Sequence, residues 1–246
     1  MCRMFFKCSL KPFFINYTIL KQFLATCHWN YFKKYDILGH HGLGWGFAYL
    51  SENNKELVIK RDINPIYHAD WESLTKIKTR FLLVHARKTL PWKRKFENVH
   101  PINIGEKYLI THNGIIKNFP EKKLNNPKLN RIFKDTSLDT RKYLCSIIDQ
   151  IQKGKDLKSG LEFIFKEIEI GAGANAFLFN SQICNVITNH NTNFNGRHHT
   201  LFLSRKYNEV IVSTTPLTNN AKEIPNYSLI QINLANLDMD FTKLHF

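Results

Sequence analysis

Two adjacent helical patterns lie in the middle of this chain with β-prone segments on both sides, and this order limits the fold more than any other feature. Asp139 or Thr140 is placed to cap the start of the first pattern. That pattern repeats apolar residues at helical spacing: Leu144, Ile147, Ile148 and Ile151. The second covers about residues 157–168 and ends before Gly171. We expect the two helices to be neighbours that pack on a sheet.

Short strand patterns precede and follow these helices. Residues 81–87 (FLLVHAR) and 106–114 (EKYLITHNG) predict strands, the second ending at an Asn-Gly turn signal. A long loop over 88–105 joins them, and a connector rich in Pro and Asn follows at 119–130. After Ala174 five more short strands are predicted, over 175–180, 184–189, 200–204, 209–214 and 228–233. Their spacing favours an antiparallel meander.

Strands, then helices, then further strands are typical of a layered α+β fold and not of a βαβ series. A chain of 246 residues can bury a substantial core, so we expect one domain over residues 1–246. No apolar run approaches the about 18 residues that a membrane span needs. Lysines and Pro12 interrupt the first thirty residues, so a cleaved secretory signal is not expected.

The net charge of +15 raises the question of a nucleic-acid partner, because clustered Lys and Arg bind phosphate backbones. The basic groups are scattered, however, at Lys33-Lys34, Lys93–Lys95, Lys122-Lys123 and Arg205-Lys206. We therefore expect solvated surface charge and no nucleic-acid partner. An acidic partner protein would fit the same charge.

The cysteines and histidines do not form a metal-binding pattern. Five cysteines are an odd number, without a C-x-x-C pair, which favours a reducing cytoplasm over a disulfide framework or a cysteine-rich zinc site. Adjacent histidines occur at His40-His41 and His198-His199, yet no H-E-x-x-H segment is present. We expect no metal and no cofactor.

The segment GAGANA at 171–176 matches the G-x-G-x-x-A pattern formally. A dinucleotide site requires a strand before this pattern and a helix after it, whereas here a helical pattern precedes and a strand pattern follows. We therefore interpret the segment as the turn that ends a helix.

Cys2 allows two interpretations. A cysteine near a terminus is usually an ordinary small hydrophobe. If Met1 is removed, Cys2 instead carries a thiol beside a free α-amine, whose reference pKa is about 7.7 to 8.0. Such a pair is a nucleophile with its own base.

Four further segments are poorly explained by packing alone: 40–50 (HHGLGWGFAYL), 83–91 (LVHARKTLP), 98–114 (NVHPINIGEKYLITHNG) and 137–144 (SLDTRKYL). Behind Cys2, their order resembles the class II glutamine amidotransferases, in particular small stand-alone members that open with Met-Cys-Arg. That family shows an N-terminal cysteine, an aromatic-containing glycine turn, H-x-R, N-x-H-P, H-N-G and an Asp before a helix. The resemblance covers about residues 1–145 and, more loosely, the tail through 209–217.

The resemblance implies a four-layer αββα sandwich of the N-terminal-nucleophile hydrolase type, with mostly antiparallel sheets. It also implies that Cys2 attacks the side-chain amide carbon of glutamine and passes its thiol proton to its own α-amine through water. The tetrahedral oxyanion would be stabilised by the side-chain amide of Asn113 and the backbone N–H of Gly114. Glycine allows close approach there because it lacks a Cβ.

Substrate recognition is implied for three further residues: Arg87, Asp139 and Thr89. Arg87 would hold the α-carboxylate of glutamine in a bidentate pair, and Asp139 would accept from the α-ammonium. His85, His100 and His112 accompany the family motifs and are given structural hydrogen-bonding roles. Taken singly, Asn113-Gly114 could instead form a hairpin turn, Arg87 a surface ion pair and Asp139 a helix N-cap.

Three positions depart from the family pattern. Leu43 replaces the Asp that usually precedes the glycine of the D-G-W/F-G segment. After H-x-R the family continues with x-A-T or x-A-S, whereas this chain has Lys88-Thr89-Leu90, so the expected hydroxyl is missing or displaced to Thr89. Arg141 replaces the acid that often follows the binding Asp. These changes concern substrate selection more than the nucleophile.

The implied function is a glutaminase that releases ammonia, with a separate synthase subunit as the acceptor because no synthase domain is expected to follow. The alternatives are a stand-alone γ-glutamyl peptidase or amidohydrolase, and a catalytically degenerate basic binding protein of the same fold. A cytoplasmic location is expected in each case.

Overall fold

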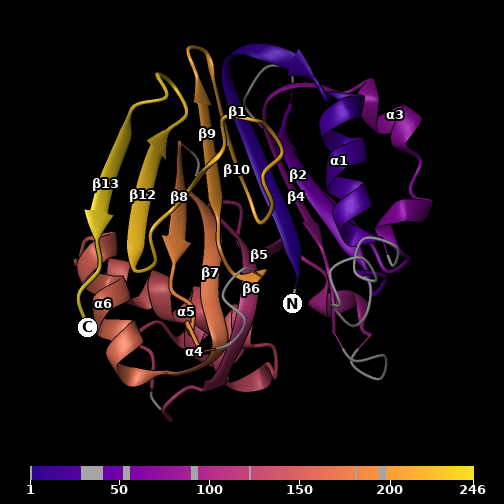
Figure 1. Cartoon of the computed structure of the whole chain (residues 1–246). Helices are drawn as coiled ribbons and strands as arrows, with labels where there is room; N and C mark the ends of the chain where they lie inside the picture. The colour runs from indigo at the N-terminus through magenta and orange to yellow at the C-terminus, as the bar shows by residue number, and fades with distance from the viewer. Residues whose placement is uncertain are drawn as a thin grey trace. The chain divides into compact units, whose positions relative to one another are not determined.

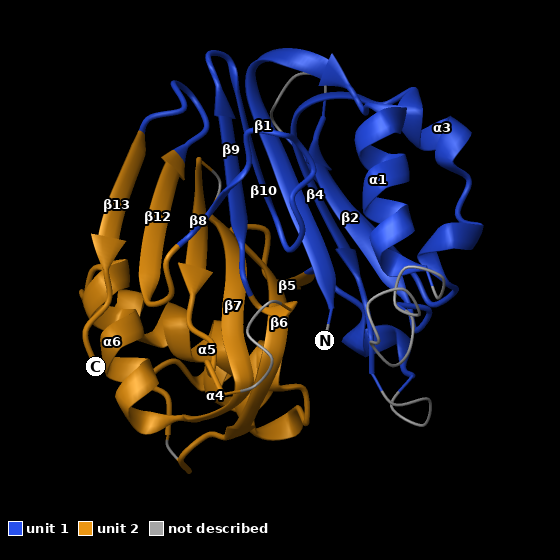
Figure 2. Ribbon diagram, viewed as in Figure 1, with its two compact units in different colours: residues 1–101, 200–224, 233–238 blue, residues 102–199, 225–232, 239–246 orange. Residues whose placement is uncertain are grey.

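A computed structural model describes residues 2–28, 41–51, 56–89, 94–121, 123–180, 182–193 and 198–246. Within these ranges no helix is both long and apolar enough to cross a membrane. The chain divides into two compact units, coloured separately in Figure 2. Unit 1 comprises residues 1–101, 200–224 and 233–238, and unit 2 comprises residues 102–199, 225–232 and 239–246.

Unit 1 contains a seven-stranded antiparallel sheet, in the described residues, with the order β11-β9-β10-β1-β4-β2-β3 (Figure 1). Its strands are β1 (Arg3–Phe14), β2 (Trp45–Leu50), β3 (Leu57–Asp62), β4 (Lys78–Ala86), β9 (Phe202–Lys206), β10 (Glu209–Ser213) and β11 (Lys222–Glu223). Its helices are α1 (Tyr17–Cys27), α3 (Trp71–Thr75) and the short 3-10 helices η1 (Ile66–His68) and η3 (Phe96–Asn98).

The core of unit 1 forms between the sheet and α1. Asn16 caps this helix by accepting hydrogen bonds from the backbone N–H groups of Thr18 and Ile19. The apolar side of α1 places Leu20 and Phe23 against the sheet, where Phe23 meets Phe5 edge to face at 4.8 Å between ring centroids.

Unit 2 contains a six-stranded sheet, again counting described residues, with the order β13-β12-β8-β7-β6-β5. Its strands are β5 (Ile102–Ile104), β6 (Tyr108–Asn118), β7 (Glu169–Asn180), β8 (Ile183–Thr188), β12 (Ser228–Asn233) and β13 (Met239–Lys243). Strands β5 to β8 pair antiparallel in turn, as do β12 and β13. Its helices are α4 (Pro127–Asp135), α5 (Asp139–Gln152) and α6 (Leu157–Glu167).

Helix α5 lies at the centre of the unit 2 core. Tyr143, Leu144 and Ile147 are buried from this helix, and Leu161 and Ile164 join them from α6. The same core includes strand residues of β5 to β8, so the helices pack on this sheet as the helical spacing predicted. The α+β class with mostly antiparallel sheets is confirmed.

Several local predictions were wrong. Strand β6 does not end at Asn113-Gly114 but continues to Asn118, so the hairpin alternative for this pair is also wrong. The GAGANA segment is not a helix-ending turn, because α6 ends at Glu167 and Gly171 already lies inside β7. The connector at 119–130 contains the start of α4, whose N-cap Asn126 precedes a proline at the first helical position.

The tail is not a single meander. Strands β9 and β10 join the sheet of unit 1 through the pairing of β10 with β1. Strands β7, β8, β12 and β13 belong to the sheet of unit 2. Turn signals between short strands do not reveal which sheet each strand enters, since pairing partners are distant in sequence.

Candidate active site

Cys2 stands immediately before β1 in unit 1. The register pairs Arg3 with Ala86, so Cys2 lies one step further along, beside Arg87. On the other side of β4, Arg87 donates its backbone N–H to the Gly44 carbonyl at 2.8 Å. The C-terminal end of β4 is therefore flanked by Cys2 and by the glycine turn that precedes β2.

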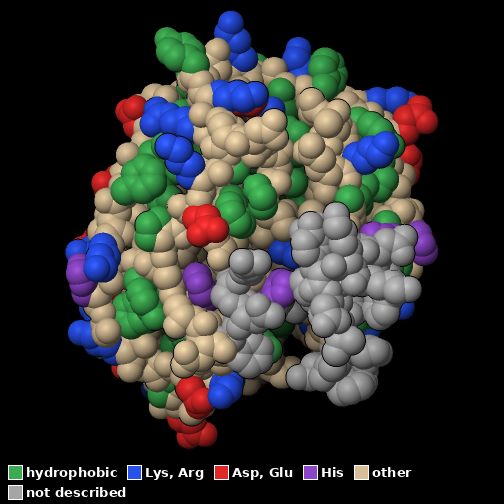
Figure 3. Space-filling view, viewed as in Figure 1, with side chains coloured by type: hydrophobic (Ala, Val, Ile, Leu, Met, Phe, Trp, Pro, Cys, Tyr) green, Lys and Arg blue, Asp and Glu red, His purple; other side chains and the backbone are tan. Residues whose placement is uncertain are grey.

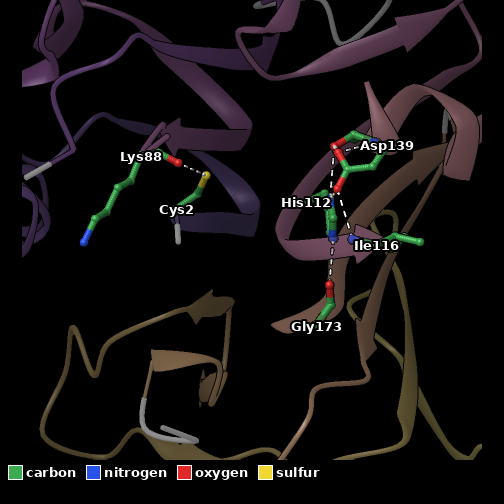
Figure 4. Close-up of polar contacts among 7 residues, drawn as sticks. Cys2, Lys88, His112, Ile116, Asp139 and Gly173 are labelled. Atoms are coloured by element: carbon green, nitrogen blue, oxygen red, sulfur yellow. Dashed lines mark hydrogen bonds and ion pairs between the residues drawn. The ribbon is translucent and has the colours of Figure 1, made fainter. Parts of the chain in front are cut away.

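The Cys2 thiol is half-buried and lies among cationic groups. Its Sγ donates to the Lys88 carbonyl oxygen at 3.8 Å (Figure 4). Burial lowers the pKa of the Lys88 ammonium, and the nearby Arg3 guanidinium lowers it further. Arg3 is itself buried and donates to the Thr214 carbonyl at 3.0 Å. The contact with the thiol thus comes from the Lys88 backbone, while the Lys88 side chain extends away from Sγ (Figure 4).

Cys2 differs from the other cysteines, all of which the structure describes. It is partly exposed, whereas the remaining four are buried: Cys8, Cys27, Cys145 and Cys184. Burial raises the pKa of Cys8, Cys27 and Cys145 to about 12, because a thiolate is poorly solvated there. Cys2 is therefore the thiol that an aqueous reagent would meet.

The loop before Pro101 packs on the glycine turn. Gly44 has φ +108°, and a Cβ there would lie 2.7 Å from Val99 Cγ2. A Cβ on Gly46 would lie 2.4 Å from the His100 carbonyl oxygen. The His100 ring stacks on His85 with 4.3 Å between ring centroids. Both glycines are thus required by close approach of this loop.

Two departures from the family pattern lie beside Arg87. Leu43 donates its backbone N–H to the Arg87 carbonyl at 3.3 Å. Thr89 follows Arg87 by two residues and is half-buried, whereas the Arg87 side chain is buried. Leu90 and Met1 lie outside the described residues.

In unit 2, Asn113 and Gly114 lie inside β6, paired with Asn175 and Ala174 of β7. Ala174 donates its backbone N–H to the Asn189 carbonyl at 2.6 Å, toward β8. The Gly114–Ala174 pair therefore does not exchange ladder bonds. The Gly114 N–H consequently points toward the other edge of β6, where β5 pairs only with residues 108–110.

Gly114 is required by its neighbour on β7. A Cβ at this position would lie 1.8 Å from the carbonyl oxygen of Gly173 and 2.3 Å from its carbonyl carbon. Both atoms belong to the backbone and have no rotamer to change. Glycine at position 114 was predicted to allow close approach of a substrate. It also allows close approach of the β7 backbone at Gly173.

Asp139 is the first residue of α5, and Leu138 is the N-cap, so the N-cap prediction for Asp139 or Thr140 was wrong by one or two residues. Asp139 Oδ1 accepts from the Thr140 N–H at 2.7 Å, and Oδ2 accepts from the Ile116 N–H at 3.1 Å (Figure 4). The β6–β7 register shifts around Ile116, and this irregularity turns its donor toward the carboxylate. Two backbone donors thus orient an acid that is only partly buried.

The His112 ring ties these elements together. Its Nε2 lies 3.1 Å from the Gly173 carbonyl oxygen, and its Nδ1 lies 3.0 Å from Thr140 Oγ1 (Figure 4). Since a carbonyl only accepts, Nε2 carries a hydrogen. Nδ1 is also 3.9 Å from Asp139 Oδ2. The predicted hydrogen-bonding role of His112 thus takes the form of a bridge between β7 and the start of α5.

Sequence reasoning missed Asn175, which faces Asn113 across the β6–β7 pair and is fully buried. The available signal was a carboxamide directly before the apolar run AFLF in the strand pattern NAFLFN. Within the described residues no group of three or more His, Cys, Asp or Glu side chains is placed to hold a metal ion.

A family model described as glutamine amidotransferases class-II matches residues 26–181, well over half of the chain. The matched range includes Arg87, Asn113 and Asp139 and begins after Cys2. No curated protein matches the chain.

Solved structures share the fold at low sequence identity. A glutamine phosphoribosylpyrophosphate amidotransferase from B. subtilis gives a TM-score of 0.66 at 14% identity, over 100% of this chain and 50% of the other. A glutamine aminotransferase class-II domain protein from Silicibacter pomeroyi gives 0.62 at 12%, over 100% of both. A predicted glutamine amidotransferase from Pseudomonas aeruginosa gives 0.57 at 14%, over 95% and 98%. The chain thus spans half the length of the B. subtilis enzyme, and it belongs to the class-II glutamine amidotransferases.

Proposed function

We propose that the chain hydrolyses the γ-amide of glutamine through a thioester on Cys2 and releases ammonia. Met1 has been removed, and the α-amine of Cys2 accepts the thiol proton through a water molecule. The sulfur bonds to the amide carbon, the C–N bond breaks, and the leaving nitrogen takes the proton and departs as ammonia. Water then cleaves the γ-glutamyl thioester, giving glutamate and the free thiol.

The other roles follow the motifs. The Asn113 carboxamide and the Gly114 N–H stabilise the oxyanion, which is where such donors contribute most to rate. Arg87 binds the α-carboxylate and Asp139 the α-ammonium of the substrate. Thr89 supplies the hydroxyl displaced from the following position.

The observation that carries this proposal is the contact of the Cys2 thiol with the Lys88 carbonyl oxygen at 3.8 Å, next to Arg87 and one step beyond the Arg3–Ala86 pair of β1 and β4, in a chain of this family. Two features of unit 2 support it. The Gly114 N–H points toward the side of β6 away from β7. The Asp139 carboxylate is oriented by two backbone donors while remaining partly exposed.

We further propose that residues 1–246 act as one type-2 glutamine amidotransferase domain that passes ammonia to a separate acceptor subunit. On the face shown in Figure 3, Lys and Arg side chains are spread out and form no single patch. An acidic surface on the acceptor would complement the net charge of +15. A cytoplasmic location follows from the sequence argument on scattered cysteines.

The second candidate is a γ-glutamyl peptidase. The observation that favours it is Lys88, a half-buried cation next to Arg87 that would suit the additional carboxylate of a γ-glutamyl peptide. Glutamate release should be measured side by side with glutamine and γ-glutamyl dipeptides, for the wild type and for Cys2→Ala. We expect faster release from glutamine and none from Cys2→Ala. Faster glutamate release from dipeptides would favour the peptidase. Equal background release by the wild type and by Cys2→Ala would favour the catalytically degenerate binding protein.

A further inference from the structure

Two buried carboxamides face each other in unit 2. Asn113 of β6 and Asn175 of β7 are directly opposite in the antiparallel register, and neither side chain is exposed. Directly opposite residues project to the same face of a sheet, with Cβ atoms about 5 Å apart. The proposed oxyanion donor therefore has a second carboxamide as its immediate cross-strand neighbour.

Both carboxamides donate to one short backbone segment. Asn113 Nδ2 donates to the His198 carbonyl at 3.3 Å, and Asn175 Nδ2 donates to the carbonyl of the next residue, His199. Asn175 is fixed at its other end as well, because its Oδ1 accepts from the Asn189 N–H at 2.8 Å. Through these two bonds Asn175 links the residue 199 backbone to β7 and to Asn189, the residue that follows β8.

The His199 side chain does not provide this anchorage. Neither of its ring nitrogens has a hydrogen-bond partner among the described residues, and the ring is fully buried. Burial lowers its pKa to about 3, so the imidazole is neutral. Its ring stacks on His190 with 6.0 Å between centroids. The hydrogen bond from Asn175 therefore anchors residue 199 through its backbone carbonyl and not through its ring.

We propose that Asn175 is a positioning residue for the reaction. It holds the 198–199 backbone so that the His198 carbonyl fixes the rotation of the Asn113 carboxamide. This inference rests on the proposed function of Asn113. An oxyanion donor acts in the transition state, so its misplacement should lower kcat and leave KM nearly unchanged. We expect a loss in kcat of about 10- to 100-fold, less than removal of the donor itself.

Asn185 of β8 is a matched control. It is equally buried, its Nδ2 donates to the Leu178 carbonyl at 3.0 Å, and its Oδ1 accepts from Gln231 at 3.1 Å. Asn175→Asp and Asn185→Asp each remove one buried N–H donor from the same sheet. Only the first should lower kcat, although both should lower the free energy of unfolding. Asn175→Ser provides a milder variant for the case that the aspartate does not fold.

The test combines glutaminase kinetics with the side-chain amide ¹⁵N–¹H signal of Asn113. A selective fall in kcat for the Asn175 variants, with a shift of the Asn113 signal, supports the positioning role. Equal kcat for both aspartate variants, or a change in KM alone, overturns it. If the wild type has no glutaminase activity, the proposed function is wrong. The Asn113 amide signal then tests only whether Asn175 positions the Asn113 side chain. An unshifted Asn113 signal in the Asn175 variants would then refute the structural linkage.

Discussion

Gly114→Ala tests the contact between β6 and β7 at the heart of unit 2. The new Cβ would lie 1.8 Å from the Gly173 carbonyl oxygen. An ordinary carbon–oxygen contact is about 3.2 Å or longer, so the strands must separate by roughly 1.4 Å. This movement acts on the same carbonyl that lies 3.1 Å from His112 Nε2.

The cost has two parts. Overpacking a close contact costs about 1 to 3 kcal/mol. Separation by this distance also breaks the His112–Gly173 bond and an adjacent ladder bond, each with a net contribution of about 0.5 to 1.5 kcal/mol. The free energy of unfolding should therefore fall by about 2 to 6 kcal/mol, a large share of the roughly 5 to 15 kcal/mol typical of a domain.

Gly154→Ala is the control, because a Cβ there meets nothing within 4 Å. Its φ of +83° limits the cost to backbone strain, about 1 to 2 kcal/mol. In calorimetry or urea unfolding, Gly114→Ala should be clearly less stable than Gly154→Ala. If the two variants have the same unfolding midpoint, the close approach of Gly173 is not the reason for glycine at position 114.

Three further predictions concern single side chains. Thr140→Val should lower the free energy of unfolding by about 1 to 3 kcal/mol, because it removes the hydroxyl bonded to His112 Nδ1. Thr140→Ser keeps a hydroxyl and should retain most of the wild-type stability. Equal urea midpoints for the two variants would contradict a contribution from this bond. Arg87→Lys should raise KM for glutamine about 10- to 100-fold with little change in kcat, since a lysine cannot form the bidentate pair; a loss confined to kcat would show that Arg87 does not bind the ground-state carboxylate. Because the folded pKa of His199 is lowered from 6.5 to about 3, the neutral form stabilises the fold above pH 6.5, and this stability is lost as the pH falls toward 3. His199→Leu should flatten unfolding free energy against pH in that window, and an unchanged slope would place the titration elsewhere.

The helices near the centre of the chain were predictable because their apolar periodicity is local. The pattern of Leu144 and Ile147 marked α5 correctly, and the predicted start of the helix differed by one or two positions. The Asn-Gly step misled because it is a turn signal in most strands, whereas here Gly114 serves a close backbone approach inside a long strand. The sequence around a glycine does not indicate which distant backbone segment packs against it.

The places of some candidate site residues in the fold could be predicted from local patterns, whereas the contacts that support these residues could not. Arg87 and Asp139 stand in recognisable segments, and their positions at the end of β4 and the start of α5 follow from local patterns. Asn175 could not be assigned a role, because its importance depends on a partner 62 positions earlier in the β6–β7 register. The irregular register at Ile116, which gives Asp139 a backbone donor, is likewise a property of strand pairing.

The intact mass of the purified protein after treatment with a glutamine-like electrophile is the most direct test of the N-terminal thiol as nucleophile. We predict a polypeptide lacking Met1 that carries one covalent adduct, mapped to Cys2, and no adduct on Cys2→Ser. A polypeptide that retains Met1 and carries no adduct, or an adduct on one of the four buried cysteines, would contradict the account.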